Sequence, residues 1–364
     1  MEHYEPIPLQ NTDIPSAITN LIPNLQNYLI VKDGHIVKRS MDEAFERILI
    51  DTYDNVLPEH INVFFDTEFV NAYALEDEAY DYNIKHTNSG LLIHVPKHIV
   101  TTSPVHVIYI QEGHNMVHNT RIVVEPNSEF AYFEYLYSHT AGTVSFVSNS
   151  IVKENAKLTY SGISNLHQNT KTTVRRNSYV FRYGRSHYNI AEVNDGDTLS
   201  NTNIFLQERY AEGTSKSVAI TDNDQTFNLR QMIEHNAPET EGYIENYGVS
   251  NHSSTLLFEG VGKINKNMKR SVARQSNRGI VLGQNARLDA NPLLLIDEYD
   301  VEAGHGAAIG KIDEEQLYYL MSRGLPIKVA ERLIINGFLS PILELLTTDE
   351  LKHDFIRKVE QKTS

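Results

Sequence analysis

The sequence predicts a mainly β protein that ends in a helical tail. Between residues 90 and 309, short runs rich in Val, Ile, Thr, Tyr and Phe alternate with clusters of Asn, Gly, Asp and Ser. Such runs are typical of strands joined by turns. Helical spacing returns after residue 309. We therefore expect an N-terminal mixed or helical region at 1–89, a β core at 90–310 and a C-terminal helical subdomain at 311–364. Clear strand candidates are 91–95, 105–110, 121–124, 145–147 and 203–206.

The N-terminal region contains one segment with a helical pattern, at residues 40–54. Ser40 suits the N-cap and Glu43 completes a capping box. Apolar residues follow at helical spacing, at positions 41, 44, 45, 48 and 49. Prolines at positions 6, 8, 15, 23 and 58 interrupt the pattern on either side. The segment is therefore predicted to be a helix.

One local pattern recurs three times in the β core. Two apolar residues, two others, an Asn, a small residue, any residue and an apolar residue follow one another around Asn127, Asn155 and Asn285. Asn tolerates the left-handed conformation of tight bends, so the pattern predicts two strands joined by a bend. Repeated units of this kind build a β-helix. Ordinary hairpins of another all-β fold, such as a sandwich, give the same spacing, so the pattern alone leaves both architectures open.

Three helices are predicted in the tail. Asp313 and Gln316 form a helix start, and an apolar stripe follows at positions 317, 320 and 321. Gly324 is a natural stop, and Pro326 suits the first turn of a second helix with apolar positions up to 338. Pro341 ends or kinks that helix. A third helix is predicted from position 347 to about 361.

Composition excludes several classes of function. The net charge is −15, from 47 acidic and 32 basic residues, so nucleic acid and anionic membrane surfaces are improbable partners. No cysteine is present, which excludes disulfides, zinc–thiolate sites and a thiolate cage for an iron–sulfur cluster within this chain. The start shows no secretory signal pattern, and no apolar run is long enough to span a bilayer. We expect a soluble cytoplasmic protein.

Several short motifs have simpler structural interpretations. The glycine-rich stretch 260–263 lacks the spacing of a P-loop and is predicted to be a turn between strands. Six histidines lie between positions 86 and 118; His94 and His98 could share a metal, but solvated strand histidines are favoured. The pieces 195–197 and 222–224 lack the rest of a calcium loop. The acidic positions 297, 298, 300 and 302 fit a charged face beside a partner better than a cation site.

His305 has an unusual setting. It lies between Gly304 and Gly306, at the junction of the β core and the helical tail. The glycines leave the imidazole unshielded and allow another backbone to approach closely. An exposed imidazole can ligate iron in place of a thiolate. The residues alone leave open whether this histidine is a ligand or a structural residue.

The stretch 289–324, which contains His305, resembles the C-terminal signature of the SufB/SufD family of iron–sulfur cluster assembly proteins, and in detail its SufD branch. The resemblance extends over residues 90–358, whereas residues before 90 match poorly and look abbreviated. Further segments that resemble the branch, in chain order, are 90–97, 194–198, 241–244, 258–264, 317–324 and 330–338.

The resemblance implies a right-handed parallel β-helix flanked by helical parts. It also implies a non-catalytic scaffold subunit that pairs with a SufB-like subunit through the β-helix and binds a SufC-like ABC-type ATPase through the C-terminal helices. The family's functional histidine falls on His305, and Ala303 stands where some members carry a cysteine. Any acceptor thiolate would then come from the partner. No tightly bound cofactor is implied for this chain, only a transient iron–sulfur cluster in the complex.

Residues 313–346 are expected to carry the ATPase contact, because two short helices with apolar stripes project from the end of the β region. The candidate contact residues are Leu320, Arg323, Leu333 and Phe338. A homodimer is conceivable when the partner is missing. The alternative function is a β-helix protein that binds or processes polysaccharide, although tryptophan platforms and a secretion signal are missing from the sequence.

Overall fold

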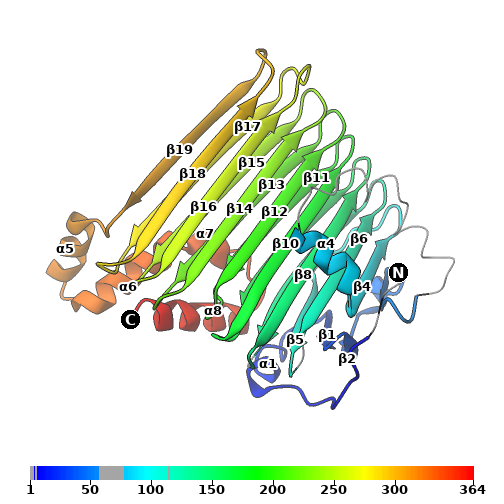
Figure 1. Cartoon of the computed structure of the whole chain (residues 1–364), viewed down its shortest axis with the longest axis horizontal. Helices are drawn as coiled ribbons and strands as arrows, with labels where there is room; N and C mark the ends of the chain where they lie inside the picture. Colours follow the sequence, from blue (N-terminus) through cyan, green and yellow to red (C-terminus); the bar gives the residue numbers. More distant parts are fainter. Residues whose placement is uncertain (1–3, 5, 57–77, 114, 139) are drawn as a thin grey trace.

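The computed structural model describes residues 4, 6–56, 78–113, 115–138 and 140–364. Two long sheets face each other, and the chain alternates between them so that each coil adds one strand to either sheet (Figure 1). From β4 onward the neighbouring strands within each sheet are parallel. The protein is therefore mainly β with a parallel β-solenoid, which confirms the predicted fold class and excludes the sandwich alternative.

The first sheet has ten strands in the order β19-β17-β15-β13-β11-β9-β7-β5-β1-β2. Their bounds are β1 Tyr28–Lys32, β2 His35–Ser40, β5 Val105–Gln111, β7 Glu129–Ser138, β9 Lys157–Asn165, β11 Arg185–Glu192, β13 Glu212–Thr221, β15 Glu241–Ser250, β17 Val272–Val281 and β19 Glu302–Gly310.

The second sheet has nine strands in the order β18-β16-β14-β12-β10-β8-β6-β4-β3. Their bounds are β3 Leu49–Thr52, β4 Ser89–Val95, β6 Met116–Val124, β8 Gly142–Val152, β10 Thr170–Val180, β12 Thr198–Leu206, β14 Thr226–His235, β16 Thr255–Ile264 and β18 Arg287–Ile296. All five strand candidates named from the sequence lie within these elements.

The bends predicted at Asn127 and Asn155 are confirmed, because both residues are left-handed, with φ of 59° and 54°. The third predicted bend differs. Asn285 is not left-handed; instead, the N–H of Ala286 donates to the carbonyl of Gly283 and closes a different turn. A Cβ at Gly283 would lie 2.3 Å from the backbone N of His252. The chain is therefore held close to the preceding coil here by a glycine rather than by Asn.

Among the described residues, the interior between the sheets is mostly apolar, but it contains a cluster of charged side chains. Arg176 is fully buried and donates to the carboxylates of Glu134, at 2.6 Å, and Glu192, at 3.2 Å. Burial raises the pKa of Glu134, and the charge of Arg176 partly offsets this. A buried ion is tolerated only when it is paired and hydrogen-bonded, and this group meets both conditions.

The N-terminal region closes the first end of the solenoid. It contains α1 (Ser16–Thr19), the 3-10 helix η1 (Glu43–Phe45) and, before β4, α4 (Glu78–His86). Strands β2 and β3 pair antiparallel with β1 and β4, at the first edge of the respective sheets. The side chains of Phe45 and Ile48 are buried in the core beneath them.

The helix predicted at 40–54 is therefore wrong. That segment forms a single 3-10 turn followed by β3, which pairs with β4. Ile48 and Ile50 are both buried with 2% exposure, so the segment gains more from completing the sheet and its core than from its weak local helical pattern.

The C-terminal tail forms α5 (Glu314–Ser322), α6 (Ile327–Phe338), α7 (Ser340–Leu343) and α8 (Asp349–Lys362). The predicted starts and stops hold closely: Asp313 caps α5, Gly324 adopts φ of 91° after it, and α8 begins after Thr348 instead of residue 347. Apolar side chains from the second half of α6 to α8 pack against the outer face of the first sheet. In contrast, α5 contributes no buried residue.

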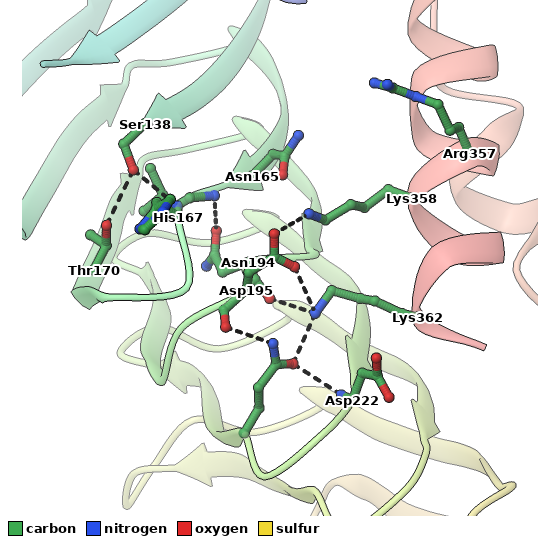
Figure 2. Close-up of polar contacts among 12 residues, drawn as sticks. Ser138, Asn165, His167, Thr170, Asn194, Asp195, Asp222, Arg357, Lys358 and Lys362 are labelled. Atoms are coloured by element: carbon green, nitrogen blue, oxygen red, sulfur yellow. Dashed lines mark hydrogen bonds and ion pairs between the residues drawn. The ribbon is translucent and has the colours of Figure 1, made fainter. Parts of the chain in front are cut away.

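Two lysines fasten α8 to the turns of the solenoid (Figure 2). Lys358 pairs with Asp195 at 2.5 Å. Lys362 is 3% exposed and donates to the Asn194 carbonyl at 2.6 Å and to the Gln225 side chain at 2.8 Å. Burial lowers the pKa of Lys362 to about 8. The acidic motif at 195–197 thus serves as an anchor for the last helix, a role that sequence reasoning did not find.

Candidate functional site at the open end and the helical hairpin

No layer from the described part of the chain covers the last coil of the solenoid. Strand β19 contains no buried residue, and β18 contains only one, Leu288. Both strands lie at the edge of their sheets, so their outer backbone groups are unpaired by any strand. Edge strands of this length are templates for pairing with another chain.

An apolar run in β18 is left uncovered at this end. Leu294 and Ile296 face the interior and are only partly buried, whereas their partners on β16, Gly262 and Ile264, are buried. Leu295 lies on the outer face of the strand, in register with Lys263, and is 50% exposed. Ile309 on β19 is 38% exposed. Partly uncovered apolar side chains beside two free strand edges are typical of a protein–protein interface.

His305 stands on this open end. In the register of the parallel strands it pairs with Gln275 of β17, which pairs in turn with Ile244 of β15. Paired residues of parallel strands point to the same face, and Ile244 lies in the interior core. His305 therefore continues an interior column of side chains, but it is exposed because no further coil covers it.

The glycines around His305 are not required by packing within this chain. A Cβ at Gly304 or Gly306 would meet no atom within 4 Å. The interior glycines Gly260 and Gly262 are different, because a Cβ there would lie 2.5 Å and 3.1 Å from the side-chain amide of Gln275. The space beside His305 is thus free for a group from outside the chain.

His305 does not belong to a ready-made metal site. Among the residues that the structure describes, no three or more His, Cys, Asp and Glu side chains gather in a metal-binding arrangement. His94 lies 3.4 Å from Glu125, and His98 is a left-handed turn residue, so the two do not form a clamp. His305 could supply one neutral nitrogen ligand to a site that other molecules complete.

The other histidines correct one expectation. His106 and His118 are buried instead of solvated, and burial lowers their pKa values to about 4 and about 3. His118 contacts the hydroxyls of Ser89, at 2.6 Å, and Thr120, at 2.7 Å. These partners satisfy a neutral imidazole inside the first coils. His114 lies outside the described residues.

Two other motifs also find structural roles. The stretch 260–263 is predicted to be a turn, but it forms the middle of β16. Its glycines make room for the side chain of Gln275. Lys263 pairs with Glu234 at 2.9 Å. In the acidic segment, the Glu298 carboxylate accepts backbone N–H groups of its own turn and of Asn267, which lowers its pKa. Glu302 pairs with Arg274 at 3.0 Å.

A second candidate surface lies on the hairpin of α5 and the first half of α6, which projects beyond the last coil (Figure 1). A hollow of about 410 Å³ opens between the helices and is lined by Glu315, Gln316, Tyr319, Leu320 and Ile334. Several large apolar side chains around it are exposed, namely Tyr318 at 75%, Tyr319 at 56%, Leu333 at 50%, Ile327 at 47% and Met321 at 42%.

The structure groups three of the four predicted contact residues on this hairpin. Leu320 lines the hollow, Leu333 is exposed, and the Arg323 guanidinium lies 5.3 Å from the ring centre of Tyr319. Phe338 is elsewhere: it packs edge-on against Tyr247 of the first sheet, with ring centres 5.6 Å apart. Its contribution within this chain is to attach α6 to the solenoid.

Comparison with known proteins agrees with this architecture. A family model for the SUF system FeS cluster assembly SufBD core domain matches residues 107–338. The chain belongs to the SufB/SufD family. Over 283 residues it is 37% identical to the iron–sulfur cluster assembly protein SufD of Bacillus subtilis, which confirms the resemblance to the SufD branch. That alignment covers 76% of this chain and 64% of the relative.

More distant members of the SufB/SufD family occur in staphylococci. The chain is 23% identical over 322 residues to a SufBD family protein of Staphylococcus epidermidis and 24% identical over 323 residues to one of Staphylococcus aureus. It spans about two thirds of the length of the curated relatives that it matches. Among the described residues, no helix has the length and apolar character to cross a membrane.

Proposed function

We propose that this chain is a non-catalytic scaffold subunit of a cytoplasmic complex that assembles iron–sulfur clusters. The observation that carries the proposal is the uncovered last coil with His305 on it. An N-terminal end closed by Phe45 and Ile48, and a C-terminal end left open with an apolar run, indicate a solenoid built to continue into another chain.

The partner at the open end is a SufB-like subunit of the same fold. Its last coil would meet β18 and β19, extend both sheets and bury the interior-facing side chains of Leu294, Ile296 and Ile309. His305 would then lie inside the interface. A nascent cluster, as cargo of the complex, would take a nitrogen ligand from His305 and its thiolates from the partner, since this chain has no cysteine.

The α5–α6 hairpin is the docking surface for an ABC-type ATPase. A short helix without buried residues gains little by packing on its own chain, and its apolar side chains are available to a partner. ATP-driven movement would enter the complex through this hairpin. In isolation, two copies of the chain could pair through the open end that otherwise receives the SufB-like subunit.

Substitution of Ile309 by Lys tests the pairing. The side chain is 38% exposed and lies on the same face of β19 as His305, so the isolated variant should fold normally, but a lysine buried between two coils should abolish co-purification with the SufB-like subunit. The matched control is Leu199→Lys, on the outer surface of β12 at 37% exposure. Unchanged co-purification of the Ile309→Lys variant would contradict the proposed interface.

A further inference from the structure

The bends at one rim of the solenoid form a column of left-handed residues. In Figure 1 they lie at the ends of the strands away from α5. Their φ angles are between 54° and 65°, and the backbone N–H of each donates to a carbonyl in the bend of the next coil. The column, in chain order, is His98, Asn127, Asn155, Tyr183, Tyr210, Glu239 and Arg270.

The middle of this column carries a stacked pair of tyrosines. The rings of Tyr183 and Tyr210 are 4.8 Å apart and nearly parallel, at 8°. The guanidinium of Arg182 lies 5.5 Å from the ring centre of Tyr183, and that of Arg209 lies 5.5 Å from the ring centre of Tyr210. The tyrosines remain 46% and 41% exposed.

Stability of the fold does not account for this choice of residue. A left-handed conformation is tolerated by Asn and costs energy for most other residues, so both tyrosines are strained, as are Glu239 and Arg270 of the same column. Asn127 and Asn155 occupy equivalent positions in the preceding coils, where their side-chain amides hydrogen-bond at 2.9 Å. The stacking of one half-exposed ring pair stabilises the fold by no more than the backbone strain of its two residues destabilises it. An exposed, stacked pair of tyrosines flanked by two guanidinium groups is instead typical of a protein-binding surface.

The charges around the pair indicate the kind of partner. Arg209 is neutralised by Glu239, with Nε 2.8 Å from the carboxylate. The Arg182 guanidinium makes no ion pair within the described part of the chain, and only the backbone N–H of Arg182 donates to a carboxylate, that of Glu208, at 3.1 Å. Tyrosine and arginine are the residues that most often dominate protein interfaces, and a free guanidinium beside a ring face selects a carboxylate with an apolar neighbour.

We propose that Arg182, Tyr183 and Tyr210 form a docking site for an acidic segment of a partner protein. The site lies on the rim of the middle coils and uses neither the open end nor the α5–α6 hairpin. It therefore goes beyond the proposed scaffold role, and its partner would bind while both of those surfaces are occupied.

Photo-crosslinking in cells tests the site in the intact complex. A benzophenone amino acid is introduced at Tyr183, with Asn127 of the same column as the matched control. We expect adducts at position 183 that map to an Asp- and Glu-rich segment of another protein, and that disappear with Arg182→Glu. Adducts with carbohydrate or nucleic acid, adducts with a segment that is not acidic, or yields equal to the control would overturn the proposal.

A double variant, Tyr183→Asn with Tyr210→Asn, separates binding from folding. Because Asn fits this bend, the melting temperature of the full chain should stay within about 2 °C of the wild type. Fluorescence anisotropy with a synthetic peptide of the cross-linked segment should show at least about a tenfold loss of affinity. A marked drop in melting temperature would show that the ring pair is structural, and unchanged affinity would show that it is not the site.

Discussion

At the residue scale, His305 ends a column of interior side chains that the register of the first sheet stacks one above another. The members, from β7 to β19, are Tyr132, Tyr160, Tyr188, Ser215, Ile244, Gln275 and His305. The buried members stabilise the fold, but no coil in the described part of the chain covers His305. The strand fixes the backbone conformation of His305, and its imidazole remains available to a ligand from outside the chain.

We expect His305→Ala to leave the fold and the complex intact, because the removed side chain is exposed. Iron and sulfide bound to the purified complex should fall by about tenfold, since one ligand of the nascent cluster is lost. The control is His94→Ala, because His94 lies in the first coils, far from the open end. Equal iron and sulfide in His305→Ala and wild type would show that the histidine does not take part.

His118 should make the protein sensitive to acid. Its pKa is lowered from 6.5 to about 3 by burial, so between these values the unfolded chain binds more protons than the folded one. Stability is fully present above pH 6.5 and falls as the pH decreases toward 3, by at most about 5 kcal/mol from this residue. His118→Gln, which keeps hydrogen-bonding capacity, should flatten the dependence of melting temperature on pH between 7 and 5. An unchanged slope would contradict the assignment.

Burial of the histidines could not be predicted from sequence. The partners of His118 are Ser89, in the strand before, and Thr120, and only the sheet register brings them around the ring. The same holds for the rim bends. Asn127 and Asn155 indicate a left-handed bend, because Asn tolerates this conformation. Tyr183 and Tyr210 adopt the same conformation although tyrosine disfavours it, so the sequence around them does not indicate a bend.

At the element scale, the signals that proved reliable are local ones. Asp313 accepts the N–H groups of Glu315 and Gln316, and both the cap and the Gly324 stop can be read from neighbouring residues. The segment at 40–54 failed because its competing structure is not local: β3 exists only through its pairing with β4. Tertiary pairing overrides a short helical pattern.

The α5–α6 hairpin should tolerate polar substitution in the isolated chain. We expect the double variant Leu320→Glu with Leu333→Glu to lower the melting temperature by no more than about 2 °C, because neither side chain is buried in the core. Co-purification of the ABC-type ATPase should be lost. Phe338→Ala is the contrasting control and should destabilise the chain by about 2 kcal/mol through its contact with Tyr247. Normal ATPase binding by the double variant would exclude the hairpin as the docking surface.

At the scale of the whole molecule, the two ends of the solenoid differ in how far their apolar side chains are covered. The first end is sealed by antiparallel strands and by Phe45 and Ile48, whereas the last end presents β18 and β19 with apolar side chains uncovered. The sequence indicated the coil and the junction at His305. It could not show that the run at 293–296 stays uncovered, since such a run is equally typical of a buried strand.

Thiol protection at the open end tests this account most directly, because the chain has no cysteine of its own. The test variant is Ala307→Cys on the exposed strand β19, and the control is Val100→Cys, at 63% exposure in the first coil. Each variant is labelled with a maleimide, and the extent of labelling is followed by the mass of this chain. Both should react rapidly in the isolated chain at low concentration. In complex with the SufB-like subunit, the reaction at position 307 should slow sharply while position 100 is unaffected. Equal reactivity of position 307 in the free and complexed chain would contradict pairing through the open end.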